Sequence, residues 1–222
     1  MKIAAIIPAL NAQRTIAAVV VESRRHVEPV LVIDDGSSDA TGEVAKAVGA
    51  TVIRHEVNRG KGAALKTGFA WALERGFDAV ITLDADGQHL ASEIPAFIDA
   101  HRETRADLII GGRAHLFEQM LPRRRMANRF SALCISIASG ARITDSQSGF
   151  RLYSAHLLRS VKLRTDGFDM ESEVIVRAGR RRMGIVTIPI ELGFVNGIAT
   201  SHYKPLKDTL RIAWTVVRTR IV

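Results

Sequence analysis

The sequence predicts an α/β fold in which a doubly wound, mainly parallel β-sheet is covered by helices on both faces. Five short runs rich in β-branched residues lie in the first half of the chain, and segments with helical spacing of apolar residues separate them. Strands that alternate with helices of this length are typical of parallel sheets. With 222 residues, 47% of them hydrophobic, the chain can bury the core of such a domain.

The first half supplies most of the predicted sheet. The strand-like runs cover residues 3–7, 30–33, 51–54, 79–83 and 108–110. The segments with helical spacing cover residues 13–26, 40–48, 61–75 and 92–104. Asp39 is the predicted N-cap of the second helix, because Glu43 follows in the next turn. Ser92 is predicted to open the fourth helix, with Pro95 in its first turn.

The second half is less regular. Its predicted elements are helices at 121–139, 169–182 and 205–222 and a strand at 186–192. The polar segment 144–151 is predicted to be a loop that exposes Arg151. The helix at 121–139 has apolar residues at Met126, Phe130, Leu133 and Ile137. Gly140 can terminate this helix.

Composition restricts the possible functions. The formal net charge is +8, from 31 Lys and Arg against 23 Asp and Glu, which favours a negatively charged partner. Nucleic acid is disfavoured, because only 5% of residues are aromatic and no stacking platform lies among the basic runs. The single cysteine, Cys134, excludes an intramolecular disulfide, fits a reducing, cytoplasmic compartment and is predicted to be buried. No apolar run is long enough to span a bilayer.

Polar residues follow four of the predicted strands. In a parallel sheet these carboxyl ends meet along one edge, where ligands bind. The four strand ends carry Asn11, the pair Asp34 and Asp35, the run 84–89, and Arg113. Turn and cap residues would explain any one of these groups, but not all four together. This edge of the sheet is therefore the predicted binding site.

The sequence LDADGQH suggests a cation site at the end of the fourth strand. Asp84 and Asp86 are two residues apart, so in an extended chain their side chains leave on the same face, with Cα atoms about 6.6 Å apart. Oxygen ligands without thiolates suit Mg²⁺ or Mn²⁺, and Gln88 can add an amide oxygen. Magnesium sites of this kind commonly complete their coordination with substrate phosphates, so the site is predicted to hold a metal against a diphosphate.

A glycine-rich run at 58–68 precedes the third predicted helix, where backbone amides could cradle a phosphate. Its spacing is not that of a P-loop. It is not a dinucleotide-binding fingerprint either, because Leu65 stands where the third glycine would be. A glycine-rich start of a helix, without any ligand, is the simpler interpretation.

Six motifs in series resemble the family-2 glycosyltransferases, and most closely their dolichyl- and polyprenyl-phosphate sugar transferases. In chain order they are IIPALN, VIDDGSSDAT, NRGKGAALKTG, LDADGQH, GGR and DSQSGFR. The similarity covers residues 3–208. It implies a GT-A fold with a nucleotide-sugar half at 1–113 and an acceptor half at 114–204, ahead of the helix at 205–222.

The resemblance also implies roles for single residues. Those implied in donor binding are Pro8, Asn11, Asp34, Asp35, Lys61, Asp84, Ala85, Arg113 and His202. The implied metal ligands are Asp84, Asp86 and Gln88, and the implied catalytic residues are Asp86 and Arg151. The acceptor phosphate would be bound by Arg125, Arg129 and Arg151. Glu173 matches a glutamate of a later motif, and residues 201–205 match a segment that closes over the donor diphosphate.

Two departures from the family pattern concern donor contacts. The first motif has Leu10 and Ala12 where the family usually has an aromatic residue and an acid. In the late loop, the arginine of the dolichyl-phosphate mannose enzymes is missing, and His202 stands near their lysine position. These changes bear on the identity of the base and the sugar more than on the reaction class. His202 is either a phosphate or metal ligand or an ordinary loop histidine.

The predicted function is metal-dependent transfer of a sugar from a nucleotide sugar to a polyprenyl phosphate, and the resemblance implies inversion at the anomeric carbon. A lipid phosphate is already ionised and can attack without a strong protein base. A hydroxyl acceptor, the first alternative, would need a carboxylate base such as Asp145, Asp169 or Glu173. The second alternative is a non-catalytic binder of phosphorylated ligands, which would not need the aspartate pair.

The segment 205–222 is predicted to be a basic amphipathic helix that carries Trp214. Together with the helix at 121–139, it suggests peripheral association with an anionic membrane surface at the cytoplasmic face. Packing of this segment on its own domain, or against a second copy in a homo-oligomer, is the alternative.

Overall fold

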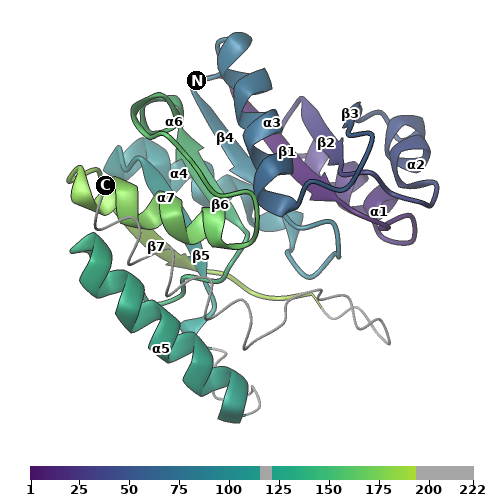
Figure 1. Cartoon of the computed structure of the whole chain (residues 1–222). Helices are drawn as coiled ribbons and strands as arrows, with labels where there is room; N and C mark the ends of the chain where they lie inside the picture. Colours follow the sequence, from purple (N-terminus) through teal and green to yellow (C-terminus); the bar gives the residue numbers. More distant parts are fainter. Residues whose placement is uncertain (116–121, 194–222) are drawn as a thin grey trace.

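The computed structural model describes residues 1–115 and 122–193, and it confirms the predicted α/β architecture with a mainly parallel sheet (Figure 1). The seven strands are β1 (Ile3–Ala9), β2 (Val30–Asp34), β3 (Thr51–Arg54), β4 (Ala79–Thr82), β5 (Leu108–Gly112), β6 (Arg151–Ser154) and β7 (Ile185–Pro189). The α-helices are α1 (Ile16–Arg24), α2 (Thr41–Ala47), α3 (Lys61–Glu74), α4 (Ile94–Thr104), α5 (Pro122–Ser139), α6 (Ala155–Ser160) and α7 (Asp169–Arg180).

The strands form one sheet in the order β3-β2-β1-β4-β6-β5-β7. Neighbouring strands are parallel except at β6, which runs antiparallel between β4 and β5. Because β6 reverses direction on both sides, β4 and β5 point the same way. The carboxyl ends of β1, β2, β4 and β5 therefore lie along one edge, as the sequence predicts.

Hydrophobic cores lie on both faces of the sheet. Alternate residues of β1 enter different cores: Ala4 and Ile6 face one, and Ala5 and Ile7 face the other. The first core is covered by α3, α5, α6 and α7, and the second by α1, α2 and α4. Figure 1 shows this layering, with α5 and α7 side by side. Two-sided burial explains why the strands read as continuous apolar runs rather than alternating ones.

Three local predictions are corrected. Asp39 is not the N-cap of α2, because that position is Ala40; Asp39 still accepts a hydrogen bond from the Thr41 backbone N–H, at 3.0 Å. Ser92 lies in a short 3₁₀ helix (Ala91–Glu93), and α4 begins after it at Ile94. Cys134 is only partly buried, on α5.

The sequence did not predict β6 and α6. All four residues of β6 are buried, yet Arg151 and Ser154 at its ends are polar, so the strand lacks an apolar pattern. Ser154 also caps α6, since its Oγ accepts a hydrogen bond from the Leu157 N–H at 3.0 Å. β6 and β7 come from the second half of the chain and complete the sheet that the first half begins.

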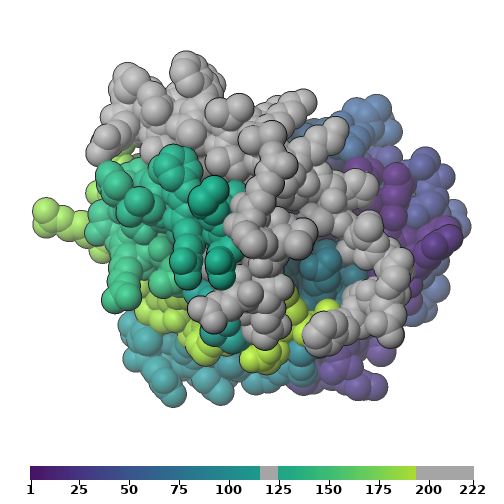
Figure 2. All heavy atoms as spheres, turned by 90° about the horizontal axis from the view of Figure 1, so that it is seen from below, coloured from purple at the N-terminus to yellow at the C-terminus, as the bar shows by residue number. Residues whose placement is uncertain are grey.

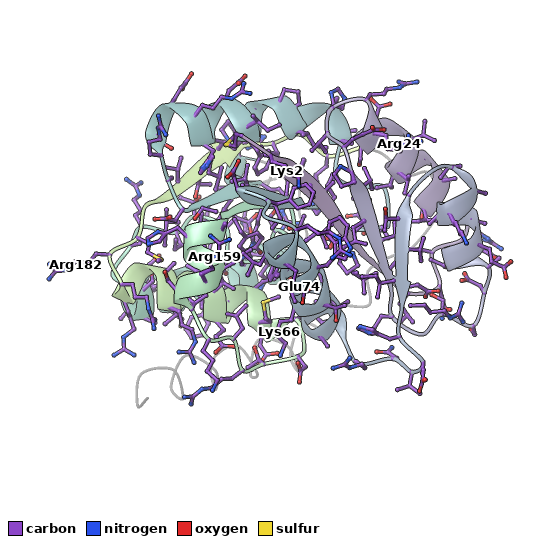
Figure 3. All side chains as sticks on the ribbon, turned by 90° about the horizontal axis from the view of Figure 1, so that it is seen from above. Lys2, Arg24, Lys66, Glu74, Arg159 and Arg182 are labelled. Carbon is purple, nitrogen blue, oxygen red and sulfur yellow. The ribbon has the colours of Figure 1, made fainter. Side chains whose placement is uncertain are left out.

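Within residues 1–115 and 122–193, no helix is long and apolar enough to cross a membrane. His202 and the segments 201–205 and 205–222, for which the sequence predicts a donor contact and an amphipathic helix, lie outside the described residues. Arg182, two residues after the end of α7, points away from the body of the molecule (Figure 3).

Candidate functional site

The centre of the candidate site is an ion-pair cluster where β4 ends. Asp84 follows β4 by two residues, and its Oδ1 lies 2.6 Å from the ammonium of Lys61, the first residue of α3. The same ammonium lies 3.1 Å from Oε2 of Glu171, in the first turn of α7. Three elements far apart in sequence therefore meet at one lysine side chain.

The close fit of this cluster explains Gly149. A Cβ atom on Gly149 would lie 2.7 Å from both carboxylate oxygens of Asp84 and 2.7 Å from Nζ of Lys61. The DSQSG segment thus passes directly over the ion pair, which only glycine permits. Burial opposes the charged form of Lys61, but the charges of Asp84 and Glu171 outweigh it and raise the lysine pKa above its usual value. Lys61 therefore stays protonated.

The two aspartates of the LDADGQH motif have different environments. Burial favours the neutral form of Asp84, but the charge of Lys61 and the hydrogen bond from its ammonium outweigh it, so the pKa of Asp84 is well below its usual range. Asp86 is partly buried and forms no ion pair with any of the described residues. Its burial, and next the like charge of Asp84, raise the pKa of Asp86, and one of its oxygens accepts the Gln88 N–H at 3.0 Å.

A divalent cation fits these residues. Lys61 and Arg113 face four carboxylates, those of Asp84, Asp86, Asp145 and Glu171, which leaves an excess of two negative charges. The described part of the chain contains no group of three or more His, Cys, Asp or Glu side chains that could hold a metal alone. A Mg²⁺ or Mn²⁺ site built from one or two carboxylates, an amide and substrate phosphates agrees with both observations.

His89 supports the turn that contains Asp84 and Asp86. Its Nδ1 accepts the Asp84 backbone N–H at 3.2 Å, and its ring packs against Phe150 with centroids 5.4 Å apart. Burial lowers the pKa of His89 to about 4, so the ring is neutral at physiological pH. The sequence showed an imidazole in this motif without indicating its task, which is to position the turn.

Partly buried Arg113, directly after β5, pairs with the buried carboxylate of Asp145. The carboxylate accepts hydrogen bonds from Nε of Arg113 at 2.8 Å, from Nη2 at 3.3 Å, and from the Gln147 N–H at 3.0 Å. Burial opposes ionisation of Asp145, but Arg113 outweighs it and lowers the carboxyl pKa. Asp145 is therefore unsuited to act as a general base, which removes one of the three base candidates.

The predicted donor-binding residues of the first two strand ends hold turns together. Asp34 is fully buried, accepts the Ser37 N–H at 2.9 Å and pairs with Arg54 at 3.0 Å. Asn11 is exposed, with a φ of 52°, and its Oδ1 accepts the Ser38 N–H at 2.9 Å. Pro8 lies within β1 and is partly buried. These contacts join the end of β1 to the turn after β2.

Asp35 joins β2 to the segment that leads into α3. Its carboxylate lies 2.6 Å from Nδ1 of His55 and accepts the N–H groups of Arg59 and Gly60 at 3.0 and 2.8 Å. This network sets the start of α3 and hence the position of Lys61. His55 is a further positioning residue that the sequence did not indicate.

The glycine-rich run follows the simpler of its two interpretations. Cβ atoms on Gly60 and Gly62 would lie 2.6 and 2.8 Å from the backbone carbonyl oxygen of Asp166. The same carbonyl accepts the Ala63 N–H at 3.0 Å, so it occupies the start of α3. The glycines allow residues 166–167 to pack on the helix, and the Asp166 carbonyl takes the place that the alternative, a phosphate cradle, would need.

The prediction that Arg151 is exposed is wrong. Arg151 is 0% exposed, and its guanidinium donates to the backbone carbonyls of Ser148, Glu171 and Ser146 at 2.7, 2.7 and 2.8 Å. The physical reason is its place at the start of β6, between two other strands. Arg151 therefore ties the loop that carries Asp145 to the first turn of α7, and its expected contact with an acceptor phosphate is not available in this arrangement.

The two glutamates of the GFDMESE segment have opposite roles. Glu173 is buried in contacts with the Arg164 and Thr165 N–H groups, at 2.9 and 3.0 Å, and with Arg177 at 2.7 Å. Glu173 therefore holds the loop at residues 164–165, and these contacts make its carboxylate unsuited to act as a general base. Glu171, which the sequence did not indicate, reaches the site instead. The sequence contained a signal for this difference. Glu171 and Glu173 are two positions apart on a helix, so their side chains point in directions that differ by more than half a turn, and only one of them can face the site.

Two predicted acceptor residues lie on α5, whereas the ion-pair cluster is built from α3, α7 and the segment after β4. Arg125 and Arg129 are on α5, partly buried and exposed respectively. α5 nevertheless contacts the site loop, because Ser131 Oγ lies 3.0 Å from Ser146 Oγ. Ala85 is buried beside the site, and its carbonyl accepts a hydrogen bond from Thr15 Oγ1 at 2.6 Å.

Comparison with known proteins gives consistent matches. The Glycosyl transferase family 2 model matches residues 4–167. An undecaprenyl-phosphate mannosyltransferase of Micrococcus luteus is 32% identical over 203 residues, covering 86% of this chain and 83% of the relative. A UDP-N-acetylglucosamine–dolichyl-phosphate N-acetylglucosaminyltransferase of Methanococcus voltae is 30% identical over 209 residues, with coverage of 84% and 83%.

Solved structures match the fold across the whole chain. Glucosyl-3-phosphoglycerate synthase of Mycobacterium tuberculosis in complex with UDP has a TM-score of 0.72 and 21% identity, covering 100% of this chain and 80% of that one. The same enzyme with Mn²⁺ and UDP-glucose has a TM-score of 0.68 and 22% identity, with coverage of 99% and 78%. At this identity the likeness shows the GT-A fold.

Proposed function

The chain belongs to glycosyl transferase family 2, and we propose that it transfers a sugar from a nucleotide-sugar donor to a polyprenyl phosphate. The observation that carries this proposal is the cluster of Lys61, Asp84, Asp86 and Glu171 at the carboxyl edge of the sheet. The acceptor class is supported by the relatives in Micrococcus luteus and Methanococcus voltae, whose names give undecaprenyl phosphate and dolichyl phosphate.

Asp86 and Gln88 would hold a Mg²⁺ or Mn²⁺ ion, with the second carboxylate oxygen of Asp84 beside them. The M. tuberculosis structures with UDP and Mg²⁺ or Mn²⁺ support a divalent cation on this fold. When bound, such a cation offsets the negative charge that develops on the leaving diphosphate. A bound cation would stabilise the charged form of Asp86 in particular, because it would offset both the cost of burying that carboxylate and its repulsion from Asp84.

The charge pattern favours a phosphate acceptor. An oxygen of the lipid phosphate would attack the anomeric carbon while the bond from that carbon to the diphosphate oxygen breaks, which inverts the anomeric centre and releases a nucleoside diphosphate. The attacking oxygen already carries charge, so no proton has to be removed. Two of the three carboxylates that a hydroxyl acceptor could use as a base, Asp145 and Glu173, are engaged in other contacts.

Binding of the donor class is tested by thermal shift with UDP, GDP, CDP and dTDP, each with and without Mn²⁺. A ligand at ~100 times its Kd adds about 2.7 kcal/mol to stability, which raises the midpoint of a domain of this size by roughly 5–10 °C. We expect one diphosphate to produce such a shift, larger with Mn²⁺. No shift with any of them would contradict the proposal and favour a binder of other ligands.

The acceptor is then tested with a labelled sugar nucleotide of the base so identified. We expect label to enter the organic phase with undecaprenyl phosphate and not with undecaprenol, which has the same chain but a hydroxyl. Transfer to undecaprenol or to a free saccharide would support the hydroxyl-acceptor alternative.

A membrane-facing surface would bring such an enzyme to its substrate, and we place it on α5. Seven large hydrophobic side chains of the described residues are exposed, and four of them lie on α5 with helical spacing: Met126 (72%), Phe130 (56%), Leu133 (57%) and Ile137 (61%). Arg129 is exposed beside them. Figure 2 shows α5, in teal, at the surface. An apolar stripe flanked by arginine fits the headgroup region of an anionic, cytoplasmic leaflet.

The double variant Phe130→Asp/Leu133→Asp is expected to lose flotation with anionic liposomes. Burial of each side chain contributes about 1.5–3 kcal/mol, so the partition constant should fall by roughly a hundredfold or more. Val57→Asp is the control, because Val57 is an exposed hydrophobic residue outside α5, and this variant should float like the wild type. Unchanged flotation of the double variant would exclude α5 as the membrane surface, and a changed sedimentation mass would assign the stripe to a homo-oligomer instead.

A further inference from the structure

We propose that the ammonium of Lys61 neutralises Asp84 while no metal is bound, and that it moves onto the Glu171 carboxylate when a divalent cation binds at Asp84 and Asp86. Glu171 is called the second seat of the ammonium below. The inference rests on the metal-dependent part of the proposed function. It makes Glu171 a positioning residue of the reaction and Lys61 a group that exchanges places with the metal.

The lysine is already shared between the two carboxylates. Its Nζ lies 2.6 Å from Oδ1 of Asp84 and 3.1 Å from Oε2 of Glu171. Asp84 is therefore occupied by a monovalent cation at the place where the motif predicts a divalent one. A metal at the second oxygen of Asp84 and an ammonium 2.6 Å from its Oδ1 would repel each other, so metal binding would favour a shift of the lysine away from Asp84.

Glu171 has an acceptor oxygen that the ammonium could use. The carboxylate is buried, at 5% exposure, and among the described residues its second oxygen, Oε1, has no hydrogen-bond partner. A buried carboxylate oxygen without a donor is costly, and a lysine that moves from between the two acids onto Glu171 supplies that donor. Oε1 of Glu171 is thus an acceptor that remains available for the ammonium of Lys61.

The supports of the cluster are rigid, so only the lysine side chain has to move. The start of α3 is held by the Asp35 carboxylate, through Gly60 N–H, and by the carbonyl of Asp166. The first turn of α7 is held by Arg151, which donates to the Glu171 carbonyl at 2.7 Å. The flexible four-carbon stem of Lys61 can span the small distance between the two acids.

The exchange keeps the charges of the site balanced. If the metal expelled Lys61 to solvent, the site would lose one positive charge as it gained two. With Glu171 as the second seat, the ammonium stays beside the position where the donor diphosphate would lie. A lysine and a metal then both face the leaving group, and the excess of two carboxylate charges is cancelled by the metal alone.

A double-mutant cycle tests the exchange, with Mn²⁺ affinity measured by electron paramagnetic resonance rather than by activity. We expect Lys61→Met to bind Mn²⁺ at least about tenfold more tightly, because the competing cation is gone. Glu171→Gln should bind Mn²⁺ at least about tenfold more weakly. In the Lys61→Met background, Glu171→Gln should lose most of its effect, because the second seat matters only when a lysine uses it.

Glu173→Gln is the matched control, since Glu173 lies on the same helix but is engaged by Thr165 and Arg177, and its Mn²⁺ affinity should be that of the wild type. Equal effects of Glu171→Gln in both backgrounds would show a simple charge effect and overturn the exchange, while the proposed transferase function would stand. Absence of Mn²⁺ binding by the wild type, with or without nucleoside diphosphate, would overturn both the exchange and the metal-dependent reaction.

A second measurement avoids variants that fold poorly. In a crystal structure of the wild type with Mn²⁺ and the nucleoside diphosphate, Nζ of Lys61 should lie within hydrogen-bond distance of Glu171 and beyond about 4 Å from Oδ1 of Asp84. A lysine that still contacts Asp84 beside a bound metal would refute the exchange.

Discussion

Replacing Asp86 with asparagine is expected to reduce sugar transfer by roughly a hundredfold or more, because a metal at the leaving diphosphate contributes about 3 kcal/mol or more to the transition state. The change removes one charge and keeps the shape, including the oxygen that accepts the Gln88 N–H. Since Asp86 is held partly desolvated beside Asp84, its neutralisation should leave the midpoint of thermal unfolding unchanged or slightly higher.

The measurement is the rate of label transfer to undecaprenyl phosphate over a series of Mn²⁺ concentrations, with thermal unfolding of the same samples. Asp99→Asn is the control, because Asp99 is an exposed carboxylate on α4 that pairs only with Arg102 among the contacts of the described residues. Its transfer rate should equal that of the wild type. Substantial activity of Asp86→Asn at low Mn²⁺ would refute the metal role of Asp86.

The parts of the fold that the sequence predicted are those with a strong local pattern. The runs at β1, β2, β4 and β5 are continuous and apolar because both faces of the sheet are buried, and the intervening helices have their own periodicity. The polar residues after these strands lie at one edge because parallel strands share their direction. The position of Asp84 and Asp86 at this edge of the sheet could therefore be predicted from the sequence.

The parts that the sequence did not predict depend on contacts between distant segments. β6 is specified by its insertion between β4 and β5, which no local pattern in residues 151–154 reveals. Asp34 and Asp35 lie at the predicted edge, but their carboxylates are used by Ser37, Arg54 and the segment before α3. Polar side chains at a ligand-binding edge must also hold its turns, and the sequence does not separate the two tasks.

Arg151 is the clearest case of a polar residue whose task the sequence does not reveal, and its replacement is expected to have the second large effect, on stability. A charged residue in a polar segment is usually solvated, and its burial here is possible because three backbone carbonyls accept from the guanidinium. Arg151→Met leaves those carbonyls without donors in a buried place. The free energy of unfolding should fall by on the order of 3–5 kcal/mol, a large fraction of the stability of a typical domain.

Urea denaturation followed by circular dichroism measures this loss, and Arg159→Met is the control because Arg159 is an exposed arginine on α6, eight positions further along. The control should unfold at the wild-type urea concentration. A structural role also predicts that Arg151→Met, assayed cold while still folded, binds Mn²⁺ and donor less tightly, because Arg151 positions Glu171 and the loop of Asp145. If the variant were as stable as the wild type and only its KM for the lipid phosphate rose, Arg151 would contact the acceptor directly, and the loop over the site would have to open to let it do so.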